Sequence, residues 1–292
     1  LAMKRLDKIE EEVDGGTVYH KPASAAGKLM AVVAMDTATK ERIDLTDKIT
    51  EGVIVWKVPE GRWKIMQFVC VNDGDPNMDY LSAARAYVTM THEQYYKRFP
   101  QYFGTTITET FFDEPTLYRA KGRVWTPSFN DEYRARYGSS PALYYPALWY
   151  DIGPETEAAR NALFTLRSDL YAEAYPLTIS RWSAAHGALA TGHQDNEEVE
   201  NPVGTSGDLM KCFRYLDIPG NRHVGRTSHR TFLQDRQFGR LQLGPFAGHV
   251  RDIRRHGEPS LGQPLFDRNG PVRQGNQRTD PACRMVRRRQ RD

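Results

Sequence analysis

The first seventy residues alternate short apolar runs with polar turns, a pattern typical of antiparallel β-strands. Three runs predict strands: residues 28–34 (KLMAVVA), 52–58 (GVIVWKV) and 63–71 (WKIMQFVCV). Residues 59–62 (PEGR) predict a turn, since proline presets φ and glycine accepts a positive φ. We expect a hairpin module over about residues 17–71, with Trp56 and Trp63 packed across its strands. A platform for a sugar ring is the alternative for these two indoles.

Helical periods dominate from residue 83 onward. Residues 83–99 repeat apolar side chains every 3.6 positions, which predicts a helix. Its expected buried stripe is Ala84, Val88, Thr91, Tyr95 and Phe99. His92 falls off this stripe and is expected on the helix surface. The charged, heptad-like residues 1–14 are expected to be the end of a helix that begins upstream.

Three further helices are expected in the middle of the chain. They cover residues 126–137, 155–186 and 208–216. Pro176 kinks the long central helix because it lacks the N–H of the helical ladder, and Gly187 suits its end. Ser206 or Thr205 is expected to cap the last of the three.

A short β-branched and aromatic segment ends in two adjacent carboxylates. Residues 105–115 (TTITETFFDEP) indicate a buried strand that stops at Pro115, because proline cannot donate to a β-ladder. Asp113 and Glu114 therefore stand at the strand's carboxyl end, where the catalytic groups of β/α barrels lie. A carboxylate there can act as a general acid or base when its pKa is tuned. A solvated acidic turn is the alternative.

A second polar segment follows a strand expected at residues 188–191. It contains His193, Asp195, Glu197 and Glu198. Because helix, strand, polar loop and helix alternate along the chain, both acidic clusters fall at the same end of their strands. We expect a sugar or metal contact here. A hydrogen-bonded loop histidine is the alternative for His193.

Several short motifs in fixed order resemble those of a known family. They are residues 78–82 (MDYLS), 91–96 (THEQYY), 111–115 (FFDEP), 191–193 (TGH), 200–204 (ENPVG), 207–211 (GDLMK) and 217–220 (DIPG). Over about residues 28–220 the chain resembles glycoside hydrolase family 106, the α-L-rhamnosidases. The resemblance implies an α/β fold with a partial (β/α)8 TIM-type barrel over residues 72–220. Residues 1–71 would be an antiparallel β insertion.

The resemblance also implies site residues. Glu114 matches the general acid, and the loop around residues 191–193 lines the substrate pocket. The expected substrate-binding residues are Asp113, His193, Asp195 and Glu197. Enzymes of this family invert the anomeric centre, which requires a general base about 6.5–9.5 Å from the acid. Glu198 is one candidate for that base.

The family implies an oligosaccharide or polysaccharide of plants or bacteria as substrate, and an exported, periplasmic or extracellular protein. No organic cofactor is expected, and a calcium requirement stays open. A non-catalytic carbohydrate-binding protein is the alternative function.

Composition divides the chain near residue 220. Residues 221–292 contain 16 arginines, no lysine and 6 acidic residues, for a net charge of +10. Residues 1–220 contain 24 basic and 31 acidic residues, for a net charge of −7. A basic tail is one signature of nucleic-acid binding. Arginine without lysine, tyrosine or tryptophan does not suit a stacking surface, so no nucleic-acid partner is expected.

We interpret residues 221–292 as translated in a shifted reading frame from near Asn221, and therefore as a disordered or non-native tail. In the neighbouring frame, residues 249–288 can encode a family-like continuation with a Ser-Glu-Thr segment. By resemblance its glutamate is the general base, and Arg251 and Asp252 stand in that place here. The chain is therefore expected to be truncated and inactive.

Length and composition bound the rest. The 292 residues can form one large domain or two. No apolar run reaches the roughly 18 residues of a membrane helix, so no membrane partner is expected. Cys70, Cys212 and Cys283 lack C-x-x-C spacing, which argues against a zinc site or a disulfide framework. The chain opens on Leu1 rather than methionine, so we expect a piece of a longer protein.

Overall fold

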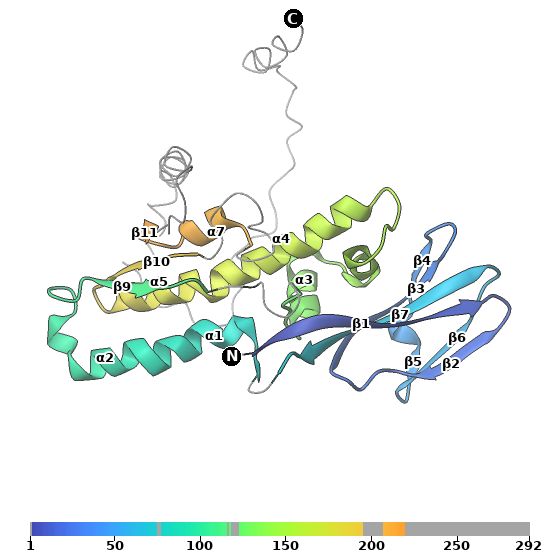
Figure 1. The fold of residues 1–292 in the computed structure, drawn as a ribbon, viewed down its shortest axis with the longest axis horizontal. Helices are drawn as coiled ribbons and strands as arrows, with labels where there is room; N and C mark the ends of the chain where they lie inside the picture. The colour runs from blue at the N-terminus through green and yellow to red at the C-terminus, as the bar shows by residue number, and fades with distance from the viewer. Residues whose placement is uncertain (1, 75–76, 116, 118–122, 195–206, 220–292) are drawn as a thin grey trace, which may run out of the picture. The chain divides into compact units, whose positions relative to one another are not determined.

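The fold combines antiparallel sheets, a small parallel sheet and a layer of helices (Figure 1). The computed structural model describes residues 2–74, 77–115, 117, 123–194 and 207–219. Its strands are β1 (Ala2–Asp14), β2 (Val18–Pro22), β3 (Lys28–Asp36), β4 (Arg42–Asp44), β5 (Ile49–Thr50), β6 (Val53–Lys57), β7 (Arg62–Asn72), β8 (Asn77–Met78), β9 (Glu109–Phe112), β10 (Leu189–Gly192) and β11 (Ile218–Pro219). Its α-helices are α1 (Tyr80–Tyr87), α2 (Glu93–Arg98), α3 (Phe129–Tyr137), α4 (Thr156–Ala174), α5 (Pro176–Ala185) and α7 (Leu209–Phe213). Shorter helical turns are η1 (Thr46–Lys48), η2 (Val88–His92), η3 (Pro100–Tyr102) and η5 (Ala142–Leu148).

The largest sheet has the strand order β4-β3-β7-β1-β8. Its N-terminal strand corrects the expected helix over residues 1–14, because β1 pairs antiparallel with β7 along almost its whole length. The charges that resemble a heptad are partners across strands: Glu12 lies opposite Lys64 and forms ion pairs with both Lys64 and Arg62. Long-range pairing therefore overrides the local helical preference of this segment.

A second antiparallel sheet has the order β2-β6-β5. The expected hairpin over residues 52–71 is wrong in its pairing, since β6 pairs with β2 and β5 whereas β7 pairs with β1 and β3. The expected contact between Trp56 and Trp63 is confirmed, with ring centroids 5.4 Å apart and planes at 83°. The two indoles come from different sheets and belong to the core between them, which includes Tyr19, Leu45 and Ile54.

A π-helical turn, η2, separates α1 from α2 and changes which side chains face inward. It adds a residue to the turn, so His92 takes the inward position expected for Thr91. His92 is 6% exposed, which overturns its expected surface position, while Tyr95 is 59% and Phe99 41% exposed. The predicted stripe holds only at Ala84 and Val88, before the turn.

The helices α3, α4 and α5 follow their sequence signals. Gly138 ends α3 in a left-handed conformation. The expected kink falls at Pro176, where α4 gives way to α5. The cap of α7 differs from the prediction, because the Asp208 carboxylate accepts hydrogen bonds from the N–H groups of Met210 and Lys211. Ser206 and Thr205 lie outside the described residues.

The third sheet is parallel and has the order β11-β10-β9 (Figure 1). One face packs on helices through Phe112 and Ala190, which join Ala84 and Val88 in a common core. The other face carries exposed apolar side chains: Phe111 at 47%, Leu189 at 40% and Ile218 at 37% exposure. The strand expected over residues 105–115 is thus shorter than predicted and buried on one side only.

A large core joins the five-stranded sheet to the helices. Phe68 of β7 stacks on Tyr145 with ring centroids 5.4 Å apart, and lies 5.5 Å from Trp149. Arg42 of β4 donates to the Ile152 carbonyl at 2.7 Å. No helix in the described part of the chain has the length and apolar character to cross a membrane. The tail over residues 221–292 lies outside the described residues.

Candidate active site

Two neighbouring parallel strands end side by side and bring the candidate residues together. Phe112, the last residue of β9, pairs with Gly192, the last residue of β10. The residues that follow, Asp113 and Glu114 on one side and His193 on the other, therefore lie at the same edge of the sheet. Carboxyl ends of parallel strands are the edge at which α/β proteins place their chemistry.

Backbone hydrogen bonds continue past the ends of both strands. The His193 N–H donates to the Phe112 carbonyl at 3.0 Å, and the Glu114 N–H donates to the His193 carbonyl at 3.2 Å. The imidazole Nδ1 lies 3.4 Å from Oδ1 of Asp113, and the ring packs edge-on to Phe111 at 5.0 Å between centroids. The sequence prediction that these side chains meet at one strand edge agrees with this geometry.

Glu114 has an unusual backbone conformation. Its φ is +46°, in the left-handed region that residues with a Cβ rarely adopt. It also precedes Pro115, which further disfavours helical backbone angles. Such a conformation costs on the order of 1–3 kcal/mol and persists where surrounding contacts impose it, often at functional sites. The other described non-glycine residues with positive φ are Lys40 and Glu51, both in the antiparallel part of the fold.

Gly192 permits the close approach of the two strand ends. A Cβ at this position would lie 2.6 Å from the Phe112 ring. Only glycine therefore lets the strand end run over that ring without displacing it.

Two residues that the sequence did not single out connect the strand ends to the helices. The Tyr171 hydroxyl of α4 lies 2.8 Å from the Pro115 carbonyl and 2.9 Å from Oε1 of Gln194. Gln194 is 1% exposed and Tyr171 3% exposed. Gln194 follows the TGH motif, which is a usable sequence signal. Tyr171 offers none beyond its place in a helical stripe.

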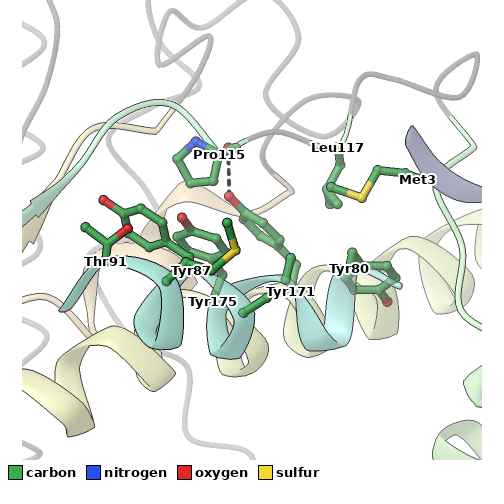
Figure 2. A pocket seen from close by; sticks show the side chains of 11 residues that line it. Met3, Tyr80, Tyr87, Thr91, Pro115, Leu117, Tyr171 and Tyr175 are labelled. Carbon is green, nitrogen blue, oxygen red and sulfur yellow. Dashed lines mark hydrogen bonds between the residues drawn. The ribbon is translucent and has the colours of Figure 1, made fainter. Parts of the chain in front are cut away.

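A cavity of about 300 Å³ lies beneath Pro115, between α1 and α4 (Figure 2). Its walls are apolar or aromatic and include Tyr87, Tyr171 and Tyr175. Burial raises the pKa of the Tyr87 and Tyr175 hydroxyls, so both stay protonated at neutral pH. The cavity lies on the helix side of the site, and neither Asp113 nor Glu114 lines it.

The remaining candidates divide into exposed and undescribed residues. Asp113 is 60% and His193 26% exposed at the side chain, and Glu114 is half-buried. Asp195, Glu197 and Glu198 lie outside the described residues, so their distances from Glu114 stay a prediction. Within the described ranges, no three His, Cys, Asp or Glu side chains gather as a metal site requires. The arrangement places the Glu114 carboxyl at the same strand edge as Asp113 and His193.

Comparisons with known proteins identify relatives. A solved rhamnosidase from Novosphingobium sp. PP1Y is 18% identical, with a TM-score of 0.46 over 64% of this chain. This chain spans 19% of that one's length. No curated protein matches.

The model of one family, described as alpha-L-rhamnosidase, matches residues 2–236. The match extends past both ends of the expected resemblance, so the prediction that it stops at Gly220 is wrong. It also includes the antiparallel strands from β1 onward. On this match over most of its 292 residues, the chain belongs to glycoside hydrolase family 106, the alpha-L-rhamnosidases.

Proposed function

We propose that this chain carries the general acid of a glycoside hydrolase that cleaves α-L-rhamnosides, and that Glu114 is that acid. The observation that supports the proposal most strongly is the backbone of Glu114, which holds a left-handed conformation at the carboxyl end of a parallel strand.

In the proposed reaction the Glu114 carboxyl donates its proton to the glycosidic oxygen as the bond to the anomeric carbon breaks. Asp113 and His193, 3.4 Å apart at the same edge, are suited to bind sugar hydroxyls. A second carboxylate must take a proton from the attacking water for the anomeric centre to invert. Glu198 is the candidate within the matched segment, and the alternative is the glutamate of the Ser-Glu-Thr segment in the other reading frame.

We further propose that β9, β10 and β11 are consecutive strands of a partial (β/α)8 barrel. Their parallel order and the helices between them support this. The exposed Phe111, Leu189 and Ile218 would then face the barrel interior, since parallel sheets are normally covered on both faces.

We retain the proposal that the arginine-rich tail is read out of frame. The slip is proposed near Asn221, and the family match, which ends at residue 236, supports a change of frame before the rest of the tail. A chain without the proposed base and the remaining strands would hydrolyse little. Nucleotide sequencing across codons 221–236 tests the slip, and an intact tail in related genes would refute it.

The remaining proposals concern setting. The substrate is an oligosaccharide or polysaccharide with terminal rhamnose, no organic cofactor takes part, and the protein is exported. Sugar binding that survives loss of the Glu114 carboxyl, without any product, would instead favour a non-catalytic carbohydrate-binding protein.

The experiment that tests the acid uses a frame-restored protein, in which the slip is corrected in the gene. We expect E114Q to lower kcat/KM for an alkyl α-L-rhamnoside by about 10²–10⁴, because an alkoxide leaves poorly without a proton. The phenolate of an aryl rhamnoside with an acidic phenol leaves without a proton from the enzyme. The loss of kcat/KM for that substrate should therefore be much smaller. If Glu198 is the base, E198Q should lower kcat/KM for both substrates by the same factor. The unmodified 292-residue chain should turn over neither.

A further inference from the structure

The strained backbone at Glu114 must be held on both sides. On its N-terminal side the Glu114 N–H bonds to the His193 carbonyl at 3.2 Å. On its C-terminal side the chain continues through Pro115, which has no N–H to anchor it. The Pro115 carbonyl is therefore the first backbone group after Glu114 that can accept an anchoring bond.

Tyr171 supplies that anchor from a helix 56 positions away in sequence. Its hydroxyl lies 2.8 Å from the Pro115 carbonyl, and the close-up shows the bond as a dashed line (Figure 2). The same hydroxyl lies 2.9 Å from Oε1 of Gln194, one residue after His193. A single buried group thus contacts both segments that carry the candidate site.

The ring of Tyr171 is itself fixed by packing. It stacks on Tyr175 at 6.4 Å between centroids, with planes at 24°. Tyr175 in turn packs edge-on to Phe112, the last residue of β9, at 5.3 Å. Because the ring is 3% exposed and stacks on Tyr175, its hydroxyl has little freedom to leave the strand ends.

We propose that Tyr171 is the positioning residue for the Glu114 carboxyl: its hydroxyl anchors the Pro115 carbonyl and so fixes the left-handed backbone that aims the Glu114 side chain. The role for an acid rests on the proposed function, whereas the anchoring of the backbone does not. Tyr171 acts through the backbone and does not touch the substrate.

The test removes only the hydroxyl, in the 292-residue chain. Y171F should speed hydrogen exchange of the Glu114 amide by about tenfold or more, because the segment opens more often. The matched control is Y145F, which removes another buried hydroxyl bond, from Tyr145 to Oδ1 of Asn130 at 2.6 Å. Y145F should leave exchange at Glu114 unchanged. Equal exchange at Glu114 in both variants would overturn the proposal.

A double-mutant cycle covers the case in which Y171F is too unstable for exchange measurements. Glycine adopts a positive φ without strain, so in an E114G background the loss of the anchor releases no strain that could offset the lost bond. The drop in unfolding midpoint caused by Y171F should therefore be larger in that background than in wild type. Strictly additive effects would show that Tyr171 only stabilises the helix layer, and would overturn the proposal.

These outcomes separate the two proposals. Faster exchange at Glu114 in Y171F, with no rhamnoside cleavage by any frame-restored protein, supports the anchor and refutes the enzyme. Cleavage by the frame-restored protein with the same kcat in Y171F as in wild type refutes the positioning role and leaves the acid in place. A lowered kcat with an unchanged KM supports both.

Discussion

The antiparallel part of the molecule and the parallel strand ends differ in the length of their strand pairing and in the burial of their apolar side chains. β1 and β7 pair without interruption from Lys4 opposite Asn72 to Asp14 opposite Arg62. β9 and β10 pair over four residues each, and one face of their sheet carries exposed Phe111, Leu189 and Ile218. The first region buries its apolar surface within itself and against the helices, while the second leaves apolar surface open.

The two regions also differ in how a residue with a strained backbone is held. Glu51 has a positive φ of 52° in a turn of the antiparallel part, followed directly by Gly52. Glu114 has a positive φ of 46° before a proline, with contacts from another strand end and a distant helix. The antiparallel sheets therefore stabilise the fold, whereas the backbone at the strand ends keeps a conformation that costs stability.

The largest expected contrast concerns two phenylalanines. Phe68 is fully buried against Tyr145 and Trp149, so F68A should lower the free energy of unfolding by about 3–5 kcal/mol. F111A, on the open face, should change it by less than about 1 kcal/mol. Chemical unfolding of both variants measures the difference. A cost at Phe111 equal to that at Phe68 would mean that the open face is covered in solution.

The close approach at Gly192 comes next. G192A places a Cβ against the Phe112 ring, so it should destabilise the chain by about 1–3 kcal/mol. G52A, where no atom lies within 4 Å of an added Cβ, separates the clash from a general glycine effect. The control G52A still includes the penalty of a side chain at a positive φ. If G192A costs no more than G52A, the contact with the Phe112 ring does not have the role assigned to it.

A smaller effect of opposite sign is expected at the strained glutamate. Relief of the left-handed strain outweighs the entropy that glycine adds to the unfolded chain, so E114G should raise the free energy of unfolding by about 0.5 kcal/mol. E51G should give a similar gain. In the frame-restored protein only E114G should abolish cleavage. Thermal unfolding and a rhamnoside assay report the two properties, and a destabilised E114G would show that its side chain has a structural role.

The smallest effect is a pH dependence from His92. Burial lowers its pKa below 6.5, against a smaller opposing effect of the Glu93 carboxylate, so the folded chain holds the ring neutral. This contribution to stability is complete above about pH 6.5 and is lost as the pH falls toward the lower folded value. Unfolding midpoints of wild type should therefore fall more than those of H92F between about pH 7 and 5.5. Parallel curves would contradict a buried neutral imidazole.

The sequence predicted what local signals determine. The kink at Pro176, the helix end at Gly138 and the meeting of Asp113 with His193 all follow from single residues or from the alternation of helix and strand. Alternation places the ends of parallel neighbours at one edge, whatever the packing behind them.

What the sequence missed depends on long-range pairing. Residues 1–14 have the charges of a helix, yet they pair with β7, where Glu12 forms ion pairs with Arg62 and Lys64. The π-turn that buries His92 depends on the layer it packs against, including Trp182 at 5.0 Å. The contact of Tyr171 with Pro115 joins residues that no local pattern relates.

The proposed role of Glu114 as general acid is tested most directly by the leaving-group dependence of E114Q in the frame-restored protein. We predict that kcat/KM falls by about 10²–10⁴ for an alkyl α-L-rhamnoside and by less than about tenfold for an aryl rhamnoside whose phenol needs no proton. Equal losses for both substrates, or no loss for either, would contradict it.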